Sequence, residues 1–244
     1  MKSIKNIIVI FSVFVTGLAC GGNKTKGSYA DTAGFINDAT DVLKSIFSIQ
    51  EKRIPQAIIR DAKGIAVIPG VIRGSGFLGS KKDMGVMSVR INDSCWSYPS
   101  FITIENHNFG WQLGVEEIDL VLIFKTDSSI QKTLQNKLTL GGTVSAAAGP
   151  LGRYGSASTN SQLNSQIYSY ARAKGLFIGA TLNGSIFRID NPENATFYGV
   201  KYINPKDIFQ NKVPPQTNFK IVNEFDKELD RISKWAINDS STNQ

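Results

Sequence analysis

The chain has 244 residues, of which 41% are hydrophobic and 19% are charged. These proportions are ordinary for a globular protein, and the length is ample for one large domain or two small ones with a sizeable core. The 27 Lys and Arg residues against 20 Asp and Glu give a formal net charge of +7, while one histidine and two cysteines are too few ligands for a structural zinc site.

The first residues have the pattern of an export signal. Lys2 and Lys5 precede an apolar run from Ile7 to Val15, which is too short to span a bilayer as a helix. The run ends at Leu18-Ala19-Cys20-Gly21, and a cysteine at this place resembles the lipobox of bacterial lipoproteins. In that motif the peptide is cut before the cysteine, which then carries acyl chains such as palmitate. The lipobox usually has Leu where Gly17 stands here, and an ordinary secretory signal is the alternative.

These features divide the chain into four parts. We predict a signal peptide over residues 1–19, a lipidated Cys20 with a flexible tether over 20–29, a single domain over 30–237 and a disordered tail over 238–244. With Cys20 acylated, Cys95 is the only thiol left, so no internal disulfide forms and the core must hold the fold. The expected location is the cell envelope, lipid-anchored and facing the periplasm. Gly21 after the cysteine favours the outer membrane.

Hydrophobic spacing predicts helices at both ends of the domain. The first has one apolar stripe at helical period, with Asp31 or Thr32 as its N-cap; the stripe consists of Phe35, Ala39, Val42, Ile46 and Ile49. The stripe is expected to face the core, with insertion of Phe35 and Phe47 into a membrane as the alternative. A short second helix starts at Pro55 and ends at Gly64. The last helix is expected from Asn218 to Ala236, with a docking face at steps of three and four residues.

The middle of the chain reads as β-structure. Strand-like runs separated by Gly, Asn, Asp and Ser cover 65–68, 85–91, 96–104, 110–124, 138–147, 166–173 and 176–189, and a short helix is expected over 126–135. Turns or single helical turns are expected at 192–199 and 205–209. The predicted fold class is α+β: a strongly curved, mostly antiparallel, barrel-like sheet with the N-terminal and C-terminal helices packed on it.

Charge is segregated along the chain. Residues 52–90 carry eight basic and two acidic side chains, residues 91–130 carry one basic and six acidic, and residues 131–190 carry six basic and one acidic. Beyond residue 190 seven of each sign cancel. This segregation is compatible with a basic face for a membrane or another polyanion. The alternative is that the charges mix when the strands pair.

Residues able to support catalysis are scarce. The run Gly74 to Gly79 matches G-x-G-x-x-G, but a turn into a strand follows it where nucleotide binding needs a helix. His107 lies in an expected turn with no nucleophile elbow in the chain, and Cys95 beside Trp96 is expected to be packed. No catalytic residue and no cofactor are therefore expected, and a degenerate hydrolase using His107 and a serine is disfavoured.

Acidic residues of the middle segment also fit a structural role. Glu117 and Asp119 share one face of an expected strand, with Glu116 on the other, and the run lacks the loop geometry that calcium sites favour. No metal site is expected. No nucleic-acid-binding motif is present either, and export would separate the protein from DNA.

Six short motifs in a fixed order identify a resemblance to the SYLF domain family. They are Ile54-Pro55 through Ala62-Lys63-Gly64, Trp96-Ser97-Tyr98-Pro99-Ser100, Gly110-Trp111-Gln112-Leu113-Gly114, the turn Gly149 to Arg153, the run Ser169 to Gly179, and Phe197-Tyr198-Gly199. The match covers about residues 35 to 232. Two departures are Ala171, where the family usually has Ser, and Asn106 to Asn108, where it has more glycines.

The resemblance implies a non-enzymatic domain that associates with phospholipids, with phosphoinositides named for eukaryotic members. We therefore expect a membrane-anchored domain that binds anionic headgroups in the bacterial envelope; actin, a partner of fungal and animal members, is not expected in that compartment. The alternative is an envelope scaffold that binds a protein or glycan, with lipid only as its anchor. The expected headgroup ligands are the basic residues Lys63, Arg73, Lys81, Lys82, Arg153, Arg172 and Lys174.

Overall fold

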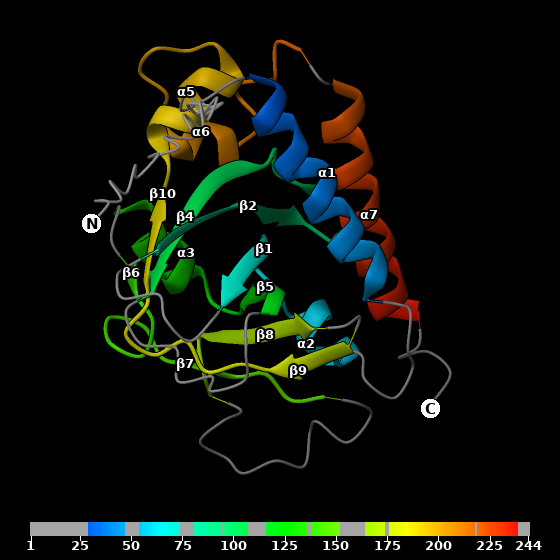
Figure 1. Ribbon diagram of the computed structural model, residues 1–244. Coiled ribbons are helices and arrows are strands. Elements are labelled where there is room, and N and C mark those ends of the chain that lie inside the picture. The colour runs from blue at the N-terminus through cyan, green and yellow to red at the C-terminus, as the bar shows by residue number, and fades with distance from the viewer. Residues whose placement is uncertain are drawn as a thin grey trace, which may run out of the picture.

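A curled β-sheet with helices packed on its outer side forms the body of the molecule (Figure 1). The computed structural model describes residues 29–46, 54–73, 81–93, 95–106, 116–135, 138–151, 164–173, 176–217 and 219–238. The signal peptide, Cys20, the tether as far as Ser28, Phe47, Ile49, the run Gly74 to Gly79, His107, the motif Gly110 to Gly114 and residues 239–244 lie outside this part of the chain.

Ten strands belong to the sheet. They are β1 (Gly64–Arg73), β2 (Lys81–Asn92), β3 (Cys95–Trp96), β4 (Ser100–Asn106), β5 (Glu116–Phe124), β6 (Leu138–Thr139), β7 (Ala146–Ala148), β8 (Ile167–Ala173), β9 (Leu176–Gly179) and β10 (Ile186–Ile189). Eight of them follow the order β6-β10-β4-β2-β1-β5-β8-β7, while β3 pairs with β2 and β9 with β8. Every pairing of named strands is antiparallel except β7 with β8, which confirms the mostly antiparallel sheet.

The central strands are apolar on both faces. In β1, Ile65 and Val67 belong to one buried cluster, whereas Ala66 and Ile68 belong to another. Successive side chains of a strand point to opposite sides, so a run of apolar residues requires cover on both sides of the sheet. Curling supplies the inner cover. Phe124 of β5 meets Phe187 of β10 with ring centroids 5.6 Å apart, although three strands separate β5 from β10 in the sheet order.

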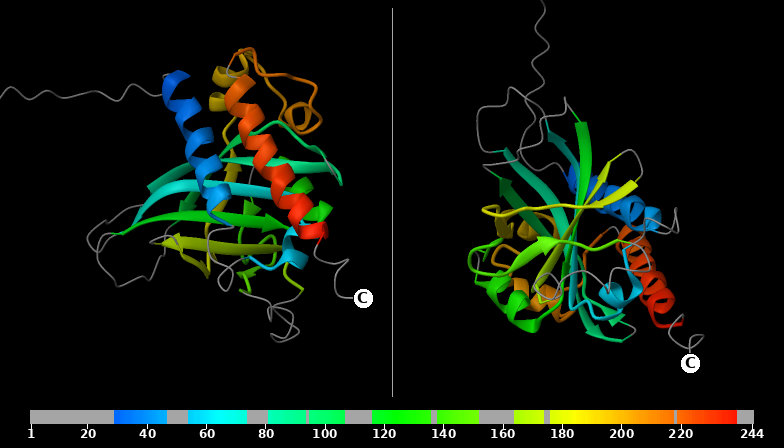
Figure 2. Two further views of the ribbon diagram at one scale, coloured as in Figure 1. Left: turned by 90° about the vertical axis from the view of Figure 1, so that its right-hand side faces the viewer. Right: turned by 90° about the horizontal axis from the view of Figure 1, so that it is seen from below.

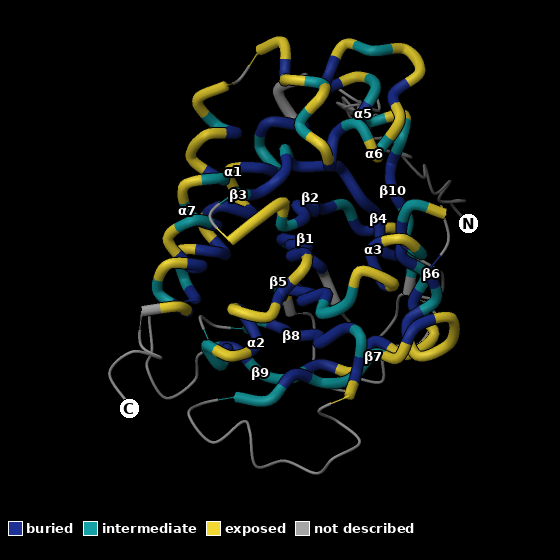
Figure 3. Tube along the Cα trace, turned by 180° about the vertical axis from the view of Figure 1, so that it is seen from behind, coloured by how far each residue is buried: buried dark blue, intermediate teal, exposed yellow. Residues whose placement is uncertain are grey.

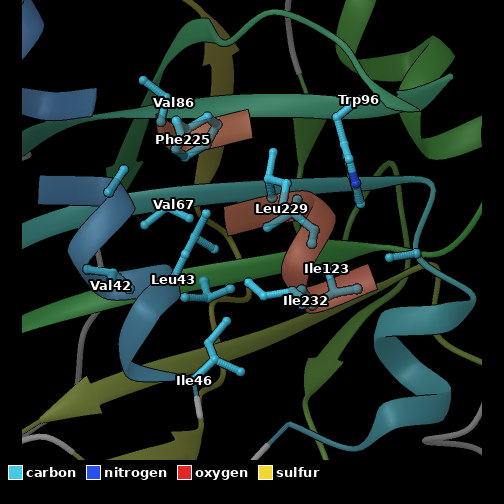
Figure 4. Close-up of a cluster of buried hydrophobic side chains, with 14 of the residues drawn as sticks. Val42, Leu43, Ile46, Val67, Val86, Trp96, Ile123, Phe225, Leu229 and Ile232 are labelled. Carbon is cyan, nitrogen blue, oxygen red and sulfur yellow. The ribbon is translucent and has the colours of Figure 1, made fainter. Parts of the chain in front are cut away.

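Two long helices cover the outer face. Helices α1 (Tyr29–Ser45) and α7 (Phe219–Asn238) contact each other and run in the same direction, so both begin at the same end of the domain (Figures 1 and 2). Leu43 of α1 and Leu229 of α7 point into a cluster with Val67 and Val86 of the sheet (Figure 4). The apolar stripe of α1 faces the core as expected, and Phe35 is packed against it.

Four short helices complete the fold: α2 (Gln56–Arg60), α3 (Asp127–Leu134), α5 (Asn191–Tyr198) and α6 (Pro205–Phe209). Helix α3 is the short helix predicted over 126–135, and the side chain of Thr126 caps it by accepting a bond from the Ser129 amide at 3.2 Å. Its Ile130 packs inside the curled sheet. Helices α5 and α6 lie at the end where α1 and α7 begin (Figure 1).

The structure corrects several predictions. Residues 138–147 were expected as one strand, but a turn containing Gly141, with φ +74°, separates β6 from β7. Helix α2 ends at Arg60 with Asp61 as its C-cap, and Gly64, the expected end of that helix, is the first residue of β1. Residues 96–104 and 176–189 were each expected as one strand, but Pro99 interrupts the first between β3 and β4, because proline cannot donate to the ladder. A turn containing Gly184, with φ +82°, separates β9 from β10. Thr32 does not cap α1, because the helix already begins at Tyr29; its hydroxyl instead donates to Glu193 of α5 at 2.5 Å.

A pair of glycine substitutions tests the close approach of β1 and β2. A methyl group at Gly85 would overlap the carbonyl oxygen of Val67 and approach the Ile68 Cα to 2.8 Å, so Gly85→Ala should lower the free energy of unfolding by about 2 kcal/mol or more. Gly34 in α1 has open space around it, so Gly34→Ala should raise the free energy of unfolding by about 0.5–1 kcal/mol. Chemical denaturation of both variants measures this. Equal effects would contradict the packing described.

Candidate functional site

The most recognisable motif of the sequence, the run Ser169 to Gly179, has a structural role. The run Ser169 to Gly179 contains most of β8 and all of β9, two strands that pair antiparallel. Tyr170 of β8 is buried and donates its hydroxyl hydrogen to the Pro150 carbonyl at 3.2 Å. Any side chain at Gly149 would overlap the Tyr170 ring, and one at Gly179 would approach the Gly149 carbonyl oxygen to 2.5 Å. The turn that starts at Gly149 and the run Ser169 to Gly179 can therefore pack together only because both contain glycine at the contact.

The Trp-Ser-x-Pro-Ser and Phe-Tyr-Gly motifs also hold elements together. The indole N–H of Trp96 donates to Ser233 of α7 at 3.0 Å, which ties β3 to the helix layer. The hydroxyl of Tyr198 at the end of α5 donates to the Pro99 carbonyl at 2.6 Å. Trp96 and Tyr198 are almost completely buried. These residues hold the fold together and are not available to a ligand.

The predicted headgroup ligands do not form one patch. Strand register brings Arg73, Lys81, Lys82 and Arg172 to one end of the sheet, at the ends of β1, β2 and β8. Lys63 is exposed at the other end of β1. Arg153 and Lys174 lie outside the described residues, and of Arg73 and Lys81 only the backbone is described.

Antiparallel pairing places acidic residues opposite these basic ones. Arg73 lies across from Glu116 in the register, and Arg172 lies across from Asp119. Lys82 lies across from Glu105, with its ammonium 3.1 Å from Asp190. Basic and acidic segments that are separate along the chain thus lie side by side in the sheet. This agrees with the second of the two alternatives, in which the charges mix when the strands pair. This end of the sheet is not a simple basic patch.

Arg172 is held most firmly. Its guanidinium contacts one oxygen of Asp119 through Nε at 2.6 Å and Nη2 at 2.5 Å, and the two side chains are only 25% and 16% exposed. The other Asp119 oxygen accepts a bond from the amide of Gly70 at 3.0 Å, at a bulge of β1 where Gly70 has φ +63°. Arg172 is therefore engaged in fastening β8 to β5 and β1.

A different surface carries exposed positive charge. We name it the lysine–tyrosine end; it consists of Lys201, Tyr202, Lys206, Lys212, Phe219 and Lys220. Tyr202 is 85% exposed and Phe219 is 48% exposed, and the Lys201 ammonium lies 5.5 Å from the Tyr202 ring centroid. The one acidic residue between Gly199 and Lys220 is Asp207. Its carboxylate oxygen lies 4.0 Å from the ammonium of Lys212. Figure 3 shows the connections around α5 and α6 as largely exposed.

Local structure explains why these residues are displayed. Helix α5 ends at Gly199, whose φ of +66° turns the chain into the connection that carries Lys201 and Tyr202. The side chain of Asn204 then caps α6 by accepting a bond from the Lys206 amide at 3.0 Å. Gln216 packs against Gly199, so the connection before α7 lies beside the one after α5.

Sequence reasoning missed this surface because it counted charge over too long a segment. The seven basic and seven acidic residues beyond Asn191 cancel, yet four of the basic ones and only Asp207 fall between residues 199 and 220. A shorter window would have found the excess. Among the residues that the structure describes, no group of three or more His, Cys, Asp and Glu could hold a metal ion, and no helix is long and apolar enough to cross a membrane.

An acidic pair on α7 is the other unusual group. Asp226 and Asp230 lie one turn apart, and each has a buried carboxylate oxygen with no hydrogen-bond partner among the described residues. Burial, and then the charge of Asp230, raise the pKa of Asp226 to about 6. Burial, followed by these two carboxylates, also raises the pKa of the Cys95 thiol, which keeps it protonated and unreactive at neutral pH.

Comparison with known proteins identifies relatives of one kind. The Ysc84 family, described as "Las17-binding protein actin regulator", matches residues 105–226. SH3 domain-containing YSC84-like protein 1 of Rattus norvegicus is 31% identical over 185 residues, covering 74% of this chain and 54% of the relative. Protein YSC84 and LAS seventeen-binding protein 3 of Saccharomyces cerevisiae are each 35% identical over 150 residues, covering 60% of this chain and 32% of the relative. The chain thus spans about a third to a half of these curated relatives.

The Asp226 carboxyl should make stability depend on pH. Its pKa in the folded state lies above its ordinary value of 3.8, so folding disfavours the charged form. The free energy of unfolding should therefore rise as pH falls from 7 to 4, by about 1 kcal/mol once solvent screening of the half-exposed group is allowed for. Denaturation of the wild type and Asp226→Asn across this range isolates the effect. A difference between them that does not change with pH would contradict it.

The Arg172–Asp119 pair should stabilise the sheet. Arg172→Ala leaves the mostly buried carboxylate of Asp119 without its cation, so the free energy of unfolding should fall by about 1–3 kcal/mol. Lys44→Ala is the matched control, because Lys44 and Asp41 form an ion pair whose side chains are 52% and 71% exposed, and loss of so exposed a pair should lower the free energy of unfolding far less. Thermal and urea denaturation compare the two. Equal losses would mean that Arg172 is not a structural residue.

Proposed function

We propose that this chain, which belongs to the Ysc84 (SYLF) family, is a non-enzymatic binding domain that contacts anionic phospholipid headgroups at a membrane of the bacterial cell envelope. The description of the family names Las17 binding and actin regulation, and one relative is named LAS seventeen-binding protein 3. The lipid ligand and the envelope location are our inference from the residues of this chain.

The observation that carries the proposal is the lysine–tyrosine end. Three of its lysines, Lys201, Lys206 and Lys220, have no ion pair in the described part of the chain. Each cation close to an anionic membrane contributes about 1 kcal/mol, and a tyrosine at the headgroup level adds an amphipathic ring. An 85% exposed Tyr202 among lysines has the chemistry of a membrane-contacting surface.

The N-terminal cysteine supplies a second attachment in this proposal. Acyl chains on Cys20 would provide the hydrophobic part, and a basic surface on the domain would provide the electrostatic part. Two weak attachments to one membrane reinforce each other because the second becomes an intramolecular event. Replacement of Cys20 by Ser, followed by metabolic labelling with a fatty acid, tests the acylation separately from the binding.

Vesicle flotation tests the headgroup contact. The chain from Gly21 onward should float with vesicles that contain an anionic phospholipid and not with neutral vesicles, and the binding should weaken as salt rises from 50 to 500 mM because the contacts are screened. Equal flotation with both vesicle types at low salt would end the proposal. Arg172→Gln, whose guanidinium is engaged with Asp119, serves as a control and should float like the wild type.

A protein partner is the second candidate function. It is favoured by the relatives, since one is named as LAS seventeen-binding and another contains an SH3 domain. In this case the chain would act as an interaction module that uses lipid only as its anchor. Capture from detergent-solubilised envelopes separates the candidates, because a stoichiometric protein that stays bound at high salt favours the module over screened headgroup contacts.

A further inference from the structure

The structure points to one orientation, and we infer that the domain stands end-on, with the lysine–tyrosine end against the membrane that carries its own N-terminal anchor. This inference rests on the proposed function and adds to it the contacting surface and the direction of the helices. Three observations carry it: the opposite charge of the lysine–tyrosine end and of the helix layer, the place where the chain enters the domain, and the position of the exposed aromatic residues.

The first observation is electrostatic. The segment from Gly199 to Lys220 has four basic residues and one acidic residue. The helix layer beyond this end has the opposite balance, with two acidic and one basic residue in α1 after Asp31 and four acidic and three basic in α7 after Lys220. Asp31, in the first turn of α1, lies at the end itself and leaves it with a net positive charge. An anionic membrane therefore attracts the end of the domain and repels its α1–α7 side. The first turn of α7 has no acidic residue, so the positive end of its dipole adds to the attraction.

The second observation is the reach of the chain. Helices α1 and α7 begin at the same end of the domain, beside α5 and α6 (Figure 2). Nine residue steps separate Cys20 from Tyr29, a distance of at most about 30 Å when fully extended. End-on docking places Tyr29 near the bilayer and leaves this tether slack. If the opposite end of the domain faced the membrane, Tyr29 would lie about one helix length, about 25 Å, from the bilayer surface. The tether would then have to be nearly straight.

The third observation is the position of the exposed aromatic residues. Tyr202 and Phe219 are the most exposed large aromatic side chains among the described residues, and both belong to the lysine–tyrosine end. Ile237 near the other end of α7 is 42% exposed and lies about 27 Å along the helix from Phe219. The headgroup layer of one leaflet is only about 7 Å thick, so one end can enter it while the other remains in water.

Environment-sensitive labels on the two ends test the orientation. Full-length chain would be anchored in anionic and in neutral vesicles, in a Cys95→Ser background, with a fluorophore at Tyr202→Cys or at Ile237→Cys. On anionic vesicles the label at 202 should shift to the blue and be quenched at least threefold more strongly by a lipid-borne quencher than the label at 237. Equal quenching, or stronger quenching at 237, would overturn the end-on orientation.

Charge reversal identifies the surface responsible. Lys201→Glu with Lys206→Glu and Lys220→Glu should return the label at 202 to a water-like spectrum while the anchor still holds the chain on the vesicle. The matched control reverses three exposed lysines elsewhere, Lys63, Lys227 and Lys234, and should leave the label at 202 in the headgroup layer. Equal effects of the two triples would overturn the inference.

The two proposals fail in different ways. If the chain from Gly21 onward prefers anionic vesicles but the label at 202 remains in water, lipid binding stands and the end-on orientation is wrong. If the label at 202 is instead protected only after addition of envelope proteins, the lysine–tyrosine end binds a protein and the orientation is also wrong. Without any preference for anionic vesicles, the proposed function itself fails.

Discussion

The central constraint on this fold is a sheet that is apolar on both faces. Strands β1 and β5 place buried aliphatic side chains on each side, so neither face can be left to water. Helices α1 and α7 cover the outer face, and the sheet covers its inner face by curling until Phe124 meets Phe187. Since burial of apolar area is the dominant favourable term in folding, the curl and the helix layer are both consequences of the same strand composition.

The family motifs serve this constraint. A tightly curled sheet brings backbones close together, and the close approach at Gly149 and Gly179 leaves no room for a side chain. The buried hydroxyl of Tyr198 and the indole N–H of Trp96 have specific acceptors, as buried polar groups require. These motifs therefore specify the scaffold, and they do not determine what the domain binds.

Much of the architecture could be predicted from the sequence because helical and strand periodicities are local. The docking face of the last helix, for example, follows directly from the spacing of Val222, Phe225 and Leu229, and all three are buried. The breaks between β3 and β4, between β6 and β7 and between β9 and β10 were missed, although Pro99, Gly141 and Gly184 mark them, because strand-like residues stand on both sides of each turn.

The site could be predicted less well, because charge is a property of surfaces and the sequence shows only segments. The basic run of residues 52–90 and the acidic run of 91–130 looked like separate faces, but strand pairing sets them against each other, as Lys82 and Glu105 show. The reverse happened beyond residue 190, where a net charge of zero concealed a basic turn region followed by a more acidic helix. Antiparallel strands mix charges that are distant in sequence, whereas the turns between short helices keep neighbouring charges together. A charge excess in a segment of about twenty residues that forms turns and short helices therefore indicates a binding surface. A larger excess that is spread over paired strands is less informative.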